Sequence, residues 1–512
     1  MNYSNAKTPP VREERLRAGI AFGGSCARLR ECAKADGGGC LNLASRAFSQ
    51  TQGCQFTLSL AILNTLRSAV IIMHGPIGCG ACSIGGAGSS KTFKALRDPS
   101  SEGLIWLNTH LDEADVISGG EQKLKDAILY AEREFHPDSI IIPVSCVPSL
   151  IGDDVDAVVA ELQEECAAQL IPVHCPGFKT KVMATAYDDV YHGILRRIVK
   201  DSERGPDNQA VSDEHDGEHD NVHEDVQRTS ANNRTVNVLN VSSMSRADEL
   251  ELQRLLEAIG LHVRFLPCYS NGLDFKLALE GGLNVSICGT HDDYFLEHLK
   301  TLYDMPFILD TMPIGRKNTA RWLRLIAGHF NVSEEAERLI AAEDKALDEA
   351  LVPFRAALKG KRVFLGGGEV RVLATAEIIQ DLDMEIVGFK GHHIDRFAEP
   401  MWAQLEGVDS VTFNVATQQP FEQANLIRRL KPDLLICHSG GNNIAAKSGL
   451  PLLPLFGPTY QYMGYAGAFE VARRIKRLFV NSAFNRNLAM HCPLPYRQTW
   501  YDKDPFSYIK ES

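Results

Sequence analysis

Short runs of apolar, mostly β-branched residues alternate along this chain with segments of helical periodicity, and this alternation restricts the fold more than any other feature. The first such runs read SAVIIMHG and SIIIPVSC, and runs of this kind are typical of parallel strands buried on both faces. The segments GEQKLKDAILYAEREF and DDVDAVVAELQEECAAQL have helical spacing and begin with glycine or acidic residues. Strands that alternate with helices indicate an α/β protein with right-handed crossovers.

The alternation occurs in three blocks, which predicts three doubly wound, Rossmann-like domains with parallel sheets. A chain of 512 residues is also too long for one hydrophobic core. The predicted parts are an irregular N-terminal arm (1–48), a first α/β domain (49–200), an acidic disordered insertion (201–234), a second α/β domain (235–358) and a third with the C-terminal tail (359–512). In such sheets, sites form where loops leave the carboxyl ends of strands.

The insertion is acidic and nearly free of apolar residues. Its His215, His219 and His223 have a spacing at which they could bind a metal. A solvated surface loop is the preferred interpretation, because so polar a segment cannot preorganise a metal site.

The net charge and the amino-terminal sequence argue against a nucleic-acid-binding, secreted or membrane-spanning protein. A net charge of −12 argues against a surface for nucleic acid or anionic membranes, which needs clustered Lys and Arg. The chain starts without the apolar core of a signal peptide, and no run reaches the ~18 apolar residues of a membrane span. We therefore expect a cytoplasmic protein.

The chain has 13 cysteines, an odd number spread along its length, so a disulfide framework is not expected in a reducing compartment. Cys79, Cys146 and Cys288 lie at or just beyond the carboxyl ends of predicted strands, and Cys54 precedes a helical run. We expect the remaining cysteines to be core or surface thiols.

The spacings of these four cysteines are too long for a zinc ribbon. Cys79 and Cys82 form a CxxC pair, but no second feature supports a thioredoxin-type redox site. Gly78 and Gly80 would let the backbone approach a bulky ligand closely. A large iron–sulfur cluster suits scattered thiolates better, with simple packing of the thiols as the alternative.

Several ordered motifs resemble nitrogenase α subunits over roughly residues 50–490. They are TQGC, HGPIGCG, PVSCVPSLIGDDVDAVVAEL, HCPGFKT, SICGTHDDYFLEHLKTLYDMPFI, KRVFLGGGEVRVLATAEIIQDLDMEIVGFKGHHIDRF and GPTYQYMGYAGAFEVARRI. The resemblance implies that Cys54, Cys79 and Cys146 bind an 8Fe–7S P-cluster completed by a homologous β subunit. It implies that Cys288 anchors the active-site cluster.

Three positions depart from the family pattern. An arginine expected shortly after Cys79 is absent, because the stretch continues Ile84-Gly-Gly-Ala-Gly. Tyr187 and Asp188 stand at about the place of paired histidines, and Met463 replaces the histidine that binds the heterometal. Dinitrogen reduction is therefore not expected.

Among nitrogenase-like proteins, the chain looks most similar to the catalytic (D) subunit of methylthio-alkane reductases. This resemblance implies ATP-dependent cleavage of C–S bonds in small thioethers, such as 2-(methylthio)ethanol or dimethyl sulfide, to methanethiol and an alkene or alkane. It implies an all-iron 8Fe–9S–C cluster, an α2β2 heterotetramer and a homodimeric reductase carrying ATP and a 4Fe–4S cluster. The alternatives are a scaffold for cofactor assembly, a non-catalytic electron carrier and a true nitrogenase α subunit.

The resemblance also suggests residues around the second cluster. The candidate proton donors are His392, His393, Tyr187 and Asp188, with a hydrogen-bonded loop pair or ordinary helix positions as the alternative. The second end of the cluster could be held by Gln461, Met463, His291 or His491, and the alternative for Met463 is helix packing. Cys82 is not a family ligand and would either touch the first cluster or fill a gap beside it.

Overall fold

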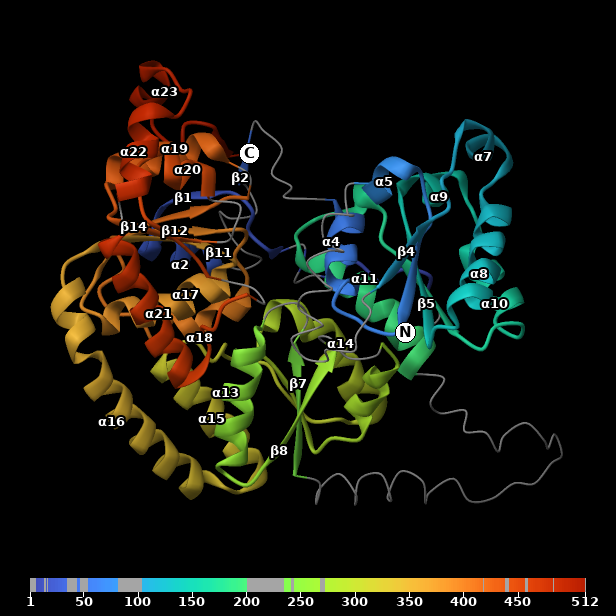
Figure 1. The fold of residues 1–512 in the computed structure, drawn as a ribbon, viewed down its shortest axis with the longest axis horizontal. Coiled ribbons are helices and arrows are strands. Elements are labelled where there is room, and N and C mark those ends of the chain that lie inside the picture. The colour runs from blue at the N-terminus through green and yellow to red at the C-terminus, as the bar shows by residue number, and fades with distance from the viewer. Residues whose placement is uncertain are drawn as a thin grey trace.

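The computed structural model describes residues 6–12, 15, 17–34, 44–46, 54–81, 104–199, 234–240, 244–267, 272–417, 419–437, 442–455, 459–481 and 483–511. Three largely parallel sheets with their helices form three units, which Figure 1 shows beside one another. The predicted fold class is confirmed.

The first unit holds a four-stranded parallel sheet in the order β4-β3-β5-β6. Its strands are β3 (Ala69–Met73), β4 (Ile105–Asn108), β5 (Ser139–Val144) and β6 (Gln169–His174). Its helices are α4 (Gln55–Leu63), α5 (Ile77–Ala81), α7 (Glu113–Ser118), α8 (Glu121–Phe135), α9 (Cys146–Ile151), α10 (Val155–Leu162), η3 (Gly177–Lys179), α11 (Ala184–Ile194) and η4 (Leu195–Val199). β3 and β5 are buried at every position, which is why their sequences are apolar without alternation.

The second unit holds the order β10-β9-β7-β8, again parallel. Its strands are β7 (Thr235–Asn240), β8 (His262–Pro267), β9 (Leu283–Ser286) and β10 (Phe307–Ile308). Its helices are α13 (Arg246–Glu257), η6 (Gly272–Leu279), α14 (Gly289–Tyr303), α15 (Arg316–Phe330) and α16 (Ser333–Leu358).

The third unit holds the order β1-β13-β12-β11-β14-β15. Its strands are β1 (Phe22–Ser25), β11 (Arg362–Gly367), β12 (Glu385–Gly391), β13 (Thr412–Val415), β14 (Leu434–Cys437) and β15 (Leu452–Pro454). Its helices are α2 (Cys26–Lys34), α17 (Glu369–Asp381), η7 (Arg396–Ala398), α18 (Glu399–Trp402), α19 (Pro420–Leu430), α20 (Asn442–Lys447), α21 (Gly464–Val480), α22 (Ala483–His491) and α23 (Gln498–Asp502). A small antiparallel pair joins β2 (Ala44–Arg46) to β16 (Ile509–Glu511).

The N-terminal segment, predicted to be irregular, contributes regular elements to the third unit. β1 adds an antiparallel edge strand to β13, and α2 packs through buried Cys26, Leu29 and Cys32 (Figure 1, dark blue among orange). Strand β1 reads FGGS, so glycines hid its strand character, and cysteines supplied the apolar face of α2. Cys32 is disulfide-bonded, against the expectation of reduced thiols.

Other sequence expectations fall on parts of the chain that the structure does not describe. Cys82 and the Ile84 stretch lie outside the described residues, as does the predicted insertion apart from Arg234. Their interpretations stay predictions. Within the described residues, no helix combines the length and the apolar character needed to cross a bilayer.

A buried ionic network ties the N-terminal segment to two units. The Arg15 guanidinium contacts Asp188 of α11 at 2.8 Å and Asp293 of α14 at 2.7 Å. Arg12 contacts the same two carboxylates at 3.3 and 2.9 Å. All four side chains are almost fully buried, and the positive charges thus compensate carboxylates that would otherwise be buried alone.

Removing one arginine of this network should destabilise the fold strongly. We expect Arg15→Leu to lower the free energy of unfolding by about 3–5 kcal/mol, because two buried carboxylates lose a partner. The measurement is urea unfolding of the full chain. In the control, Arg324→Leu removes a pair with Glu337 whose side chains are both about half-exposed, and should cost under about 1 kcal/mol. Equal losses in the two variants would contradict the prediction.

Candidate cluster-binding sites

The three predicted ligand cysteines of the first unit lie at or near helix starts: Cys54 directly precedes α4, Cys79 lies within the short helix α5, and Cys146 is the first residue of α9. β3 and β5 run parallel side by side, and the pairing continues beyond them where the Ser145 N–H donates to the His74 carbonyl at 3.1 Å. Cys79 therefore follows one strand end and Cys146 follows the neighbouring one. A Cβ on Gly75 would collide with the Ser145 side chain, so glycine is needed there for the two loops to touch.

Gly177 lies between two of the predicted thiolates. A Cβ at this position would lie 2.8 Å from Cβ of Cys54, 3.3 Å from Sγ of Cys146 and 3.4 Å from Sγ of Cys54. The Gly177 N–H also donates to Sγ of Cys146 at 3.1 Å. The structure thus brings Cys54 and Cys146 together around one glycine.

The loop around Cys79 gives its two glycines different settings. A Cβ on Gly80 would come 2.8 Å from the Asn108 amide nitrogen, so that glycine makes room for packing inside the chain. A Cβ on Gly78 would meet nothing within 4 Å, so its surroundings are open. Cys79 is half-buried in α5, Cys146 is half-buried and Cys54 is exposed.

These residues fit an iron–sulfur cluster of the kind that the resemblance implies. Three thiols on adjoining loops reach the surface, and the Gly177 position is too tight for any side chain. An exposed Cys54 leaves this edge open to ligands from a second chain. Cys175, close by, is fully buried, and burial raises the pKa of its thiol well above the usual value.

Cys288, the predicted anchor of the second cluster, lies in a buried setting. It precedes α14, is 4 % exposed, and its N–H donates to Oγ of Ser286 at 2.9 Å. Burial raises the pKa of the thiol to about 12, against the opposing charge of Arg371. The bare thiol is therefore protonated at neutral pH, and metal binding must displace its proton.

Arg371 was not singled out from the sequence. Its positive charge lowers the pKa of the Cys288 thiol. Burial by itself would lower the pKa of its guanidinium. Cys288, Tyr462 and Tyr187 raise that pKa by more than burial lowers it, so Arg371 stays charged. Tyr187 is buried and stacks on His291 with 4.0 Å between ring centroids. The structure thus gathers Tyr187, His291 and Arg371 around Cys288.

The other predicted proton donors have separate surroundings. Asp188 faces away to Arg12 and Arg15 in the ionic network of the N-terminal segment. The His392 carbonyl accepts from the Thr417 hydroxyl at 3.2 Å. His393 is buried beside the carboxylates of Glu369 and Asp395, at 3.1 and 3.3 Å.

Buried charges perturb this last group of residues. Burial raises the pKa of Glu369 to about 7. Burial alone would lower the pKa of His393, but the charge of Glu369 and the neighbouring Asp395 raise it above the usual value.

The residues proposed for the far end of the second cluster are placed as follows. Met463 is completely buried in the same apolar cluster as Cys288, and its N–H donates to Asp248 at 2.8 Å. The Gln461 amide donates to the Ala247 carbonyl at 3.4 Å. His491 is exposed at the end of α22.

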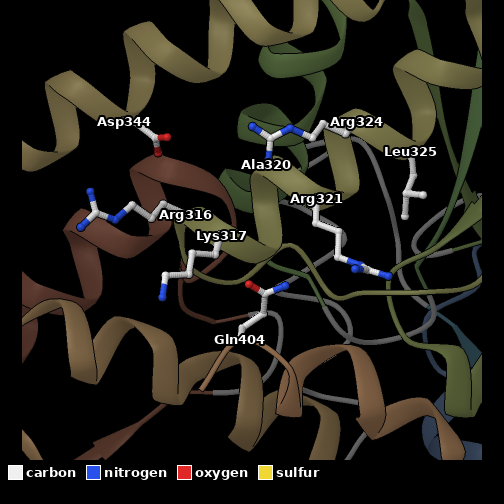
Figure 2. A pocket seen from close by; sticks show the side chains of 8 residues that line it. All are labelled: Arg316, Lys317, Ala320, Arg321, Arg324, Leu325, Asp344 and Gln404. Atoms are coloured by element: carbon white, nitrogen blue, oxygen red, sulfur yellow. The ribbon is translucent and has the colours of Figure 1, made fainter. Parts of the chain in front are cut away.

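A basic cavity of about 650 Å³ lies along α15, apart from all predicted site residues (Figure 2). Arg316, Lys317, Arg321 and Arg324 line it. The three arginines pair with carboxylates, those of Asp381, Asp310 and Glu337 among them. Its positive charge is therefore largely compensated.

A family model described as "Nitrogenase component 1 type Oxidoreductase" matches residues 54–479. The chain belongs to this family. Its resemblance to nitrogenase α subunits is confirmed at that level.

Several curated relatives are named for cofactor biosynthesis. The nitrogenase iron-molybdenum cofactor biosynthesis protein NifE of Nostoc sp. is 28% identical over 83% of this chain and 82% of its own length. The same-named protein of Methanococcus maripaludis is 26% identical over 82% of each. The nitrogenase molybdenum-iron protein alpha chain of Methanothermobacter marburgensis is 25% identical over 85% of this chain and 88% of its own.

A solved structure titled "Nitrogenase Cp1 at pH 5" has the same fold. Its TM-score is 0.66 at 20% identity, and the match covers 88% of this chain and 92% of that one. At this identity the likeness shows the fold alone.

Sequence reasoning missed Gly177, Glu369, Arg371 and Asp395. Glu369 and Arg371 stand with Glu377 in the largely apolar helix segment EVRVLATAEII, where charged residues that are buried need partners. That signal was available. Gly177 lay in the quoted motif HCPGFKT, but only the structure shows that two thiols flank it.

Replacing Gly177 should weaken the first site selectively. In Gly177→Ala, the added methyl group would push Cys54 and Cys146 apart. We expect about 10–100-fold weaker iron retention there, and an unchanged cluster at Cys288. Iron analysis and EPR of anaerobically purified protein measure both. The control is Gly328→Ala in α15, where a Cβ meets nothing within 4 Å. Equal iron in both variants would refute the role of Gly177.

Proposed function

We propose that this chain is the α-type subunit of a cofactor-assembly scaffold in a nitrogenase-like system. A homologous β-type subunit would complete an α2β2 assembly in the cytoplasm. The chain would hold one resident iron–sulfur cluster at Cys54, Cys79 and Cys146. A second cluster, anchored at Cys288, would be cargo that the scaffold receives and passes on.

The observation that carries this proposal is the single anchor at Cys288. The position at which nitrogenases hold the other end of their cluster is here Met463, a neutral thioether packed in the core. A thiolate binds iron far more strongly than a buried thioether does. A cluster held at one end can be released more easily than a cluster held at both.

The relatives support the same choice. NifE proteins, named for iron-molybdenum cofactor biosynthesis, match over more than four fifths of the chain. The nitrogenase α chain of Methanothermobacter marburgensis matches over a similar span at lower identity. The departures at Tyr187 and Met463 agree with a chain that does not itself reduce dinitrogen.

This chain's residues have distinct tasks in such a scaffold. The thiols of Cys54, Cys79 and Cys146 would bind the resident cluster, an 8Fe–7S P-cluster that supplies electron transfer. Cys288 must lose its proton to bind the cargo, and the Arg371 charge favours its thiolate. The same positive charge would attract an anionic cluster. Tyr187 and His291 form a stacked, buried pair, and the His291 N–H donates to the Cys288 carbonyl at 2.9 Å.

A second candidate is the C–S reductase, in which an all-iron 8Fe–9S–C cluster stays at Cys288 and small thioethers are the substrate. This candidate is favoured by the titratable side chains near Cys288, which include His291 with the Tyr187 ring stacked on it, and Glu369, whose charge acts on the thiol. Such groups suit proton delivery to a bound substrate. An ATP-dependent reductase homodimer with a 4Fe–4S cluster would supply the electrons.

Cluster transfer tests the scaffold directly. The anaerobically purified complex is mixed with a nitrogenase component that lacks its active-site cluster, and acetylene reduction by the acceptor is measured. We expect wild-type donor to restore activity and Cys288→Ala donor to lose this ability, while keeping the iron bound at Cys54, Cys79 and Cys146. Cys166→Ala removes another buried thiol and should transfer normally.

The same preparation decides between the two candidates. Incubation with reductase, ATP and 2-(methylthio)ethanol or dimethyl sulfide is followed by headspace analysis. Ethylene or methane without cluster transfer would replace the scaffold by the reductase. Transfer without hydrocarbon would support the scaffold.

A further inference from the structure

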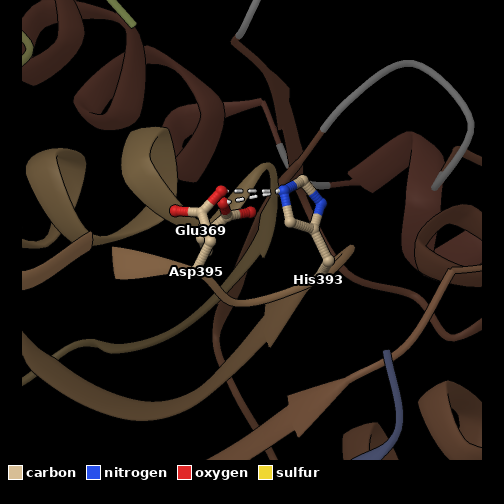
Figure 3. Close-up of side chains that lie close together, drawn as sticks. All are labelled: Glu369, His393 and Asp395. Carbon is tan, nitrogen blue, oxygen red and sulfur yellow. Dashed lines mark ion pairs between the residues drawn. The ribbon is translucent and has the colours of Figure 1, made fainter. Parts of the chain in front are cut away.

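Three side chains from two elements of the third unit converge in the protein interior beside the start of α14. Glu369 is the first residue of α17, and His393 and Asp395 follow β12. Figure 3 shows the imidazole edge of His393 pointing at both carboxylates. One ligand atom of each residue lies within 4.8 Å of the other two. This group is called the 369–393–395 cluster below.

The His393 nitrogen in the cluster lacks a normal hydrogen bond. Nε2 lies 3.1 Å from a Glu369 oxygen and 3.3 Å from an Asp395 oxygen, but meets hydrogen-bond geometry with neither. The side chain is only 6 % exposed. A buried nitrogen aimed between two carboxylate oxygens is arranged for a third partner that contacts all three atoms.

The second contacts of the cluster hold its ligands in place. The Thr290 hydroxyl donates to Oδ2 of Asp395 at 3.0 Å and lies 3.5 Å from Glu369. The other Asp395 oxygen, Oδ1, accepts from the Phe397 N–H at 2.9 Å. Fixed carboxylates of this kind are what metal sites need around their ligands.

We propose that Glu369, His393 and Asp395 bind one divalent first-row metal ion. Metal–ligand bonds of about 2.1 Å bring ligand atoms to separations that this cluster already approaches. An imidazole with two carboxylates suits Mn²⁺, Fe²⁺ or Zn²⁺, and the lack of a thiolate in the cluster disfavours Cu⁺. Two charges of the ion balance the two buried carboxylates.

The bound ion would also influence the position of Cys288. It joins α17, the loop after β12 and, through Thr290, the first turn of α14. Thr290 lies two residues after Cys288, so the bound ion fixes the helix end that presents the cluster-anchoring thiol. This site goes beyond the proposed function, because it requires neither cluster.

Manganese binding tests the site, since Mn²⁺ prefers nitrogen and oxygen ligands and avoids the many thiols of this chain. The full chain, dialysed against chelator, is titrated with MnCl2, and free Mn²⁺ is followed by its EPR signal. We expect one tight site per chain and at least about tenfold weaker binding in Glu369→Gln and in Asp395→Asn. Any Mn²⁺ bound by the acidic segment 201–234 is the same in the wild type and in all variants, so it does not affect the difference between them.

Glu377→Gln is the matched control, because Glu377 is a buried glutamate on the same helix whose carboxylate instead accepts from the Lys317 and Asn318 N–H groups. It should bind Mn²⁺ like the wild type. Mn²⁺ should also raise the Tm of the wild type and of Glu377→Gln, but not of the cluster variants.

If Glu369→Gln does not fold, Asp395→Asn carries the test, since asparagine keeps the acceptor for Phe397. The absence of a tight Mn²⁺ site in the wild type would overturn the proposal. So would equal binding by Glu377→Gln and the cluster variants. Neither result bears on cluster transfer, which is measured separately.

Discussion

Parallel strand pairing is the constraint on which both candidate sites depend. Because β3 and β5 run side by side in the same direction, the loops of Cys79 and Cys146 must leave the same edge of the sheet. β6 ends at that edge too and delivers Gly177 between Cys54 and Cys146. In the second unit, β9 leads into Cys288 in the same way. Backbone hydrogen bonds thus collect residues that are far apart in sequence.

Burial sets the chemistry at Cys288. Burial keeps the thiol neutral, whereas the Arg371 guanidinium stays charged despite its burial because Cys288, Tyr462 and Tyr187 raise its pKa. The carboxylates of Glu369 and Asp395 lie nearby, both beside His393, and the Arg15 charge acts on Asp395. Opposite charges buried at close range keep one another ionised where each alone would be neutral. The charges around Cys288 are therefore set by this chain's own residues.

The sequence was sufficient for the fold class, because strand and helix periodicity alternate along the chain, whereas the grouping of Cys54 with Cys146 came only from the family resemblance. It was insufficient for the N-terminal segment, since FGGS has the composition of a turn and becomes β1 only by pairing with β13. It also could not separate Tyr187 from Asp188. The two are adjacent on α11, yet one stacks on His291 while the other contacts Arg15. Successive side chains on an α-helix point in directions that differ by about 100° around the helix axis.

The two cysteine sites differ in exposure, and this difference limits what each can do. Cys54 reaches the surface, so the cluster proposed there would be open to ligands from a second chain. Cys288 is enclosed by this chain's own helices, and whatever it binds meets only groups that the chain provides. Those groups include one thiol, a guanidinium and the Tyr187–His291 stack, with a neutral thioether at the position of the family's second ligand. A site with one strong ligand and a matching positive charge can bind an anionic cluster without fixing it at both ends, which is the property that separates carrying a cluster from keeping it.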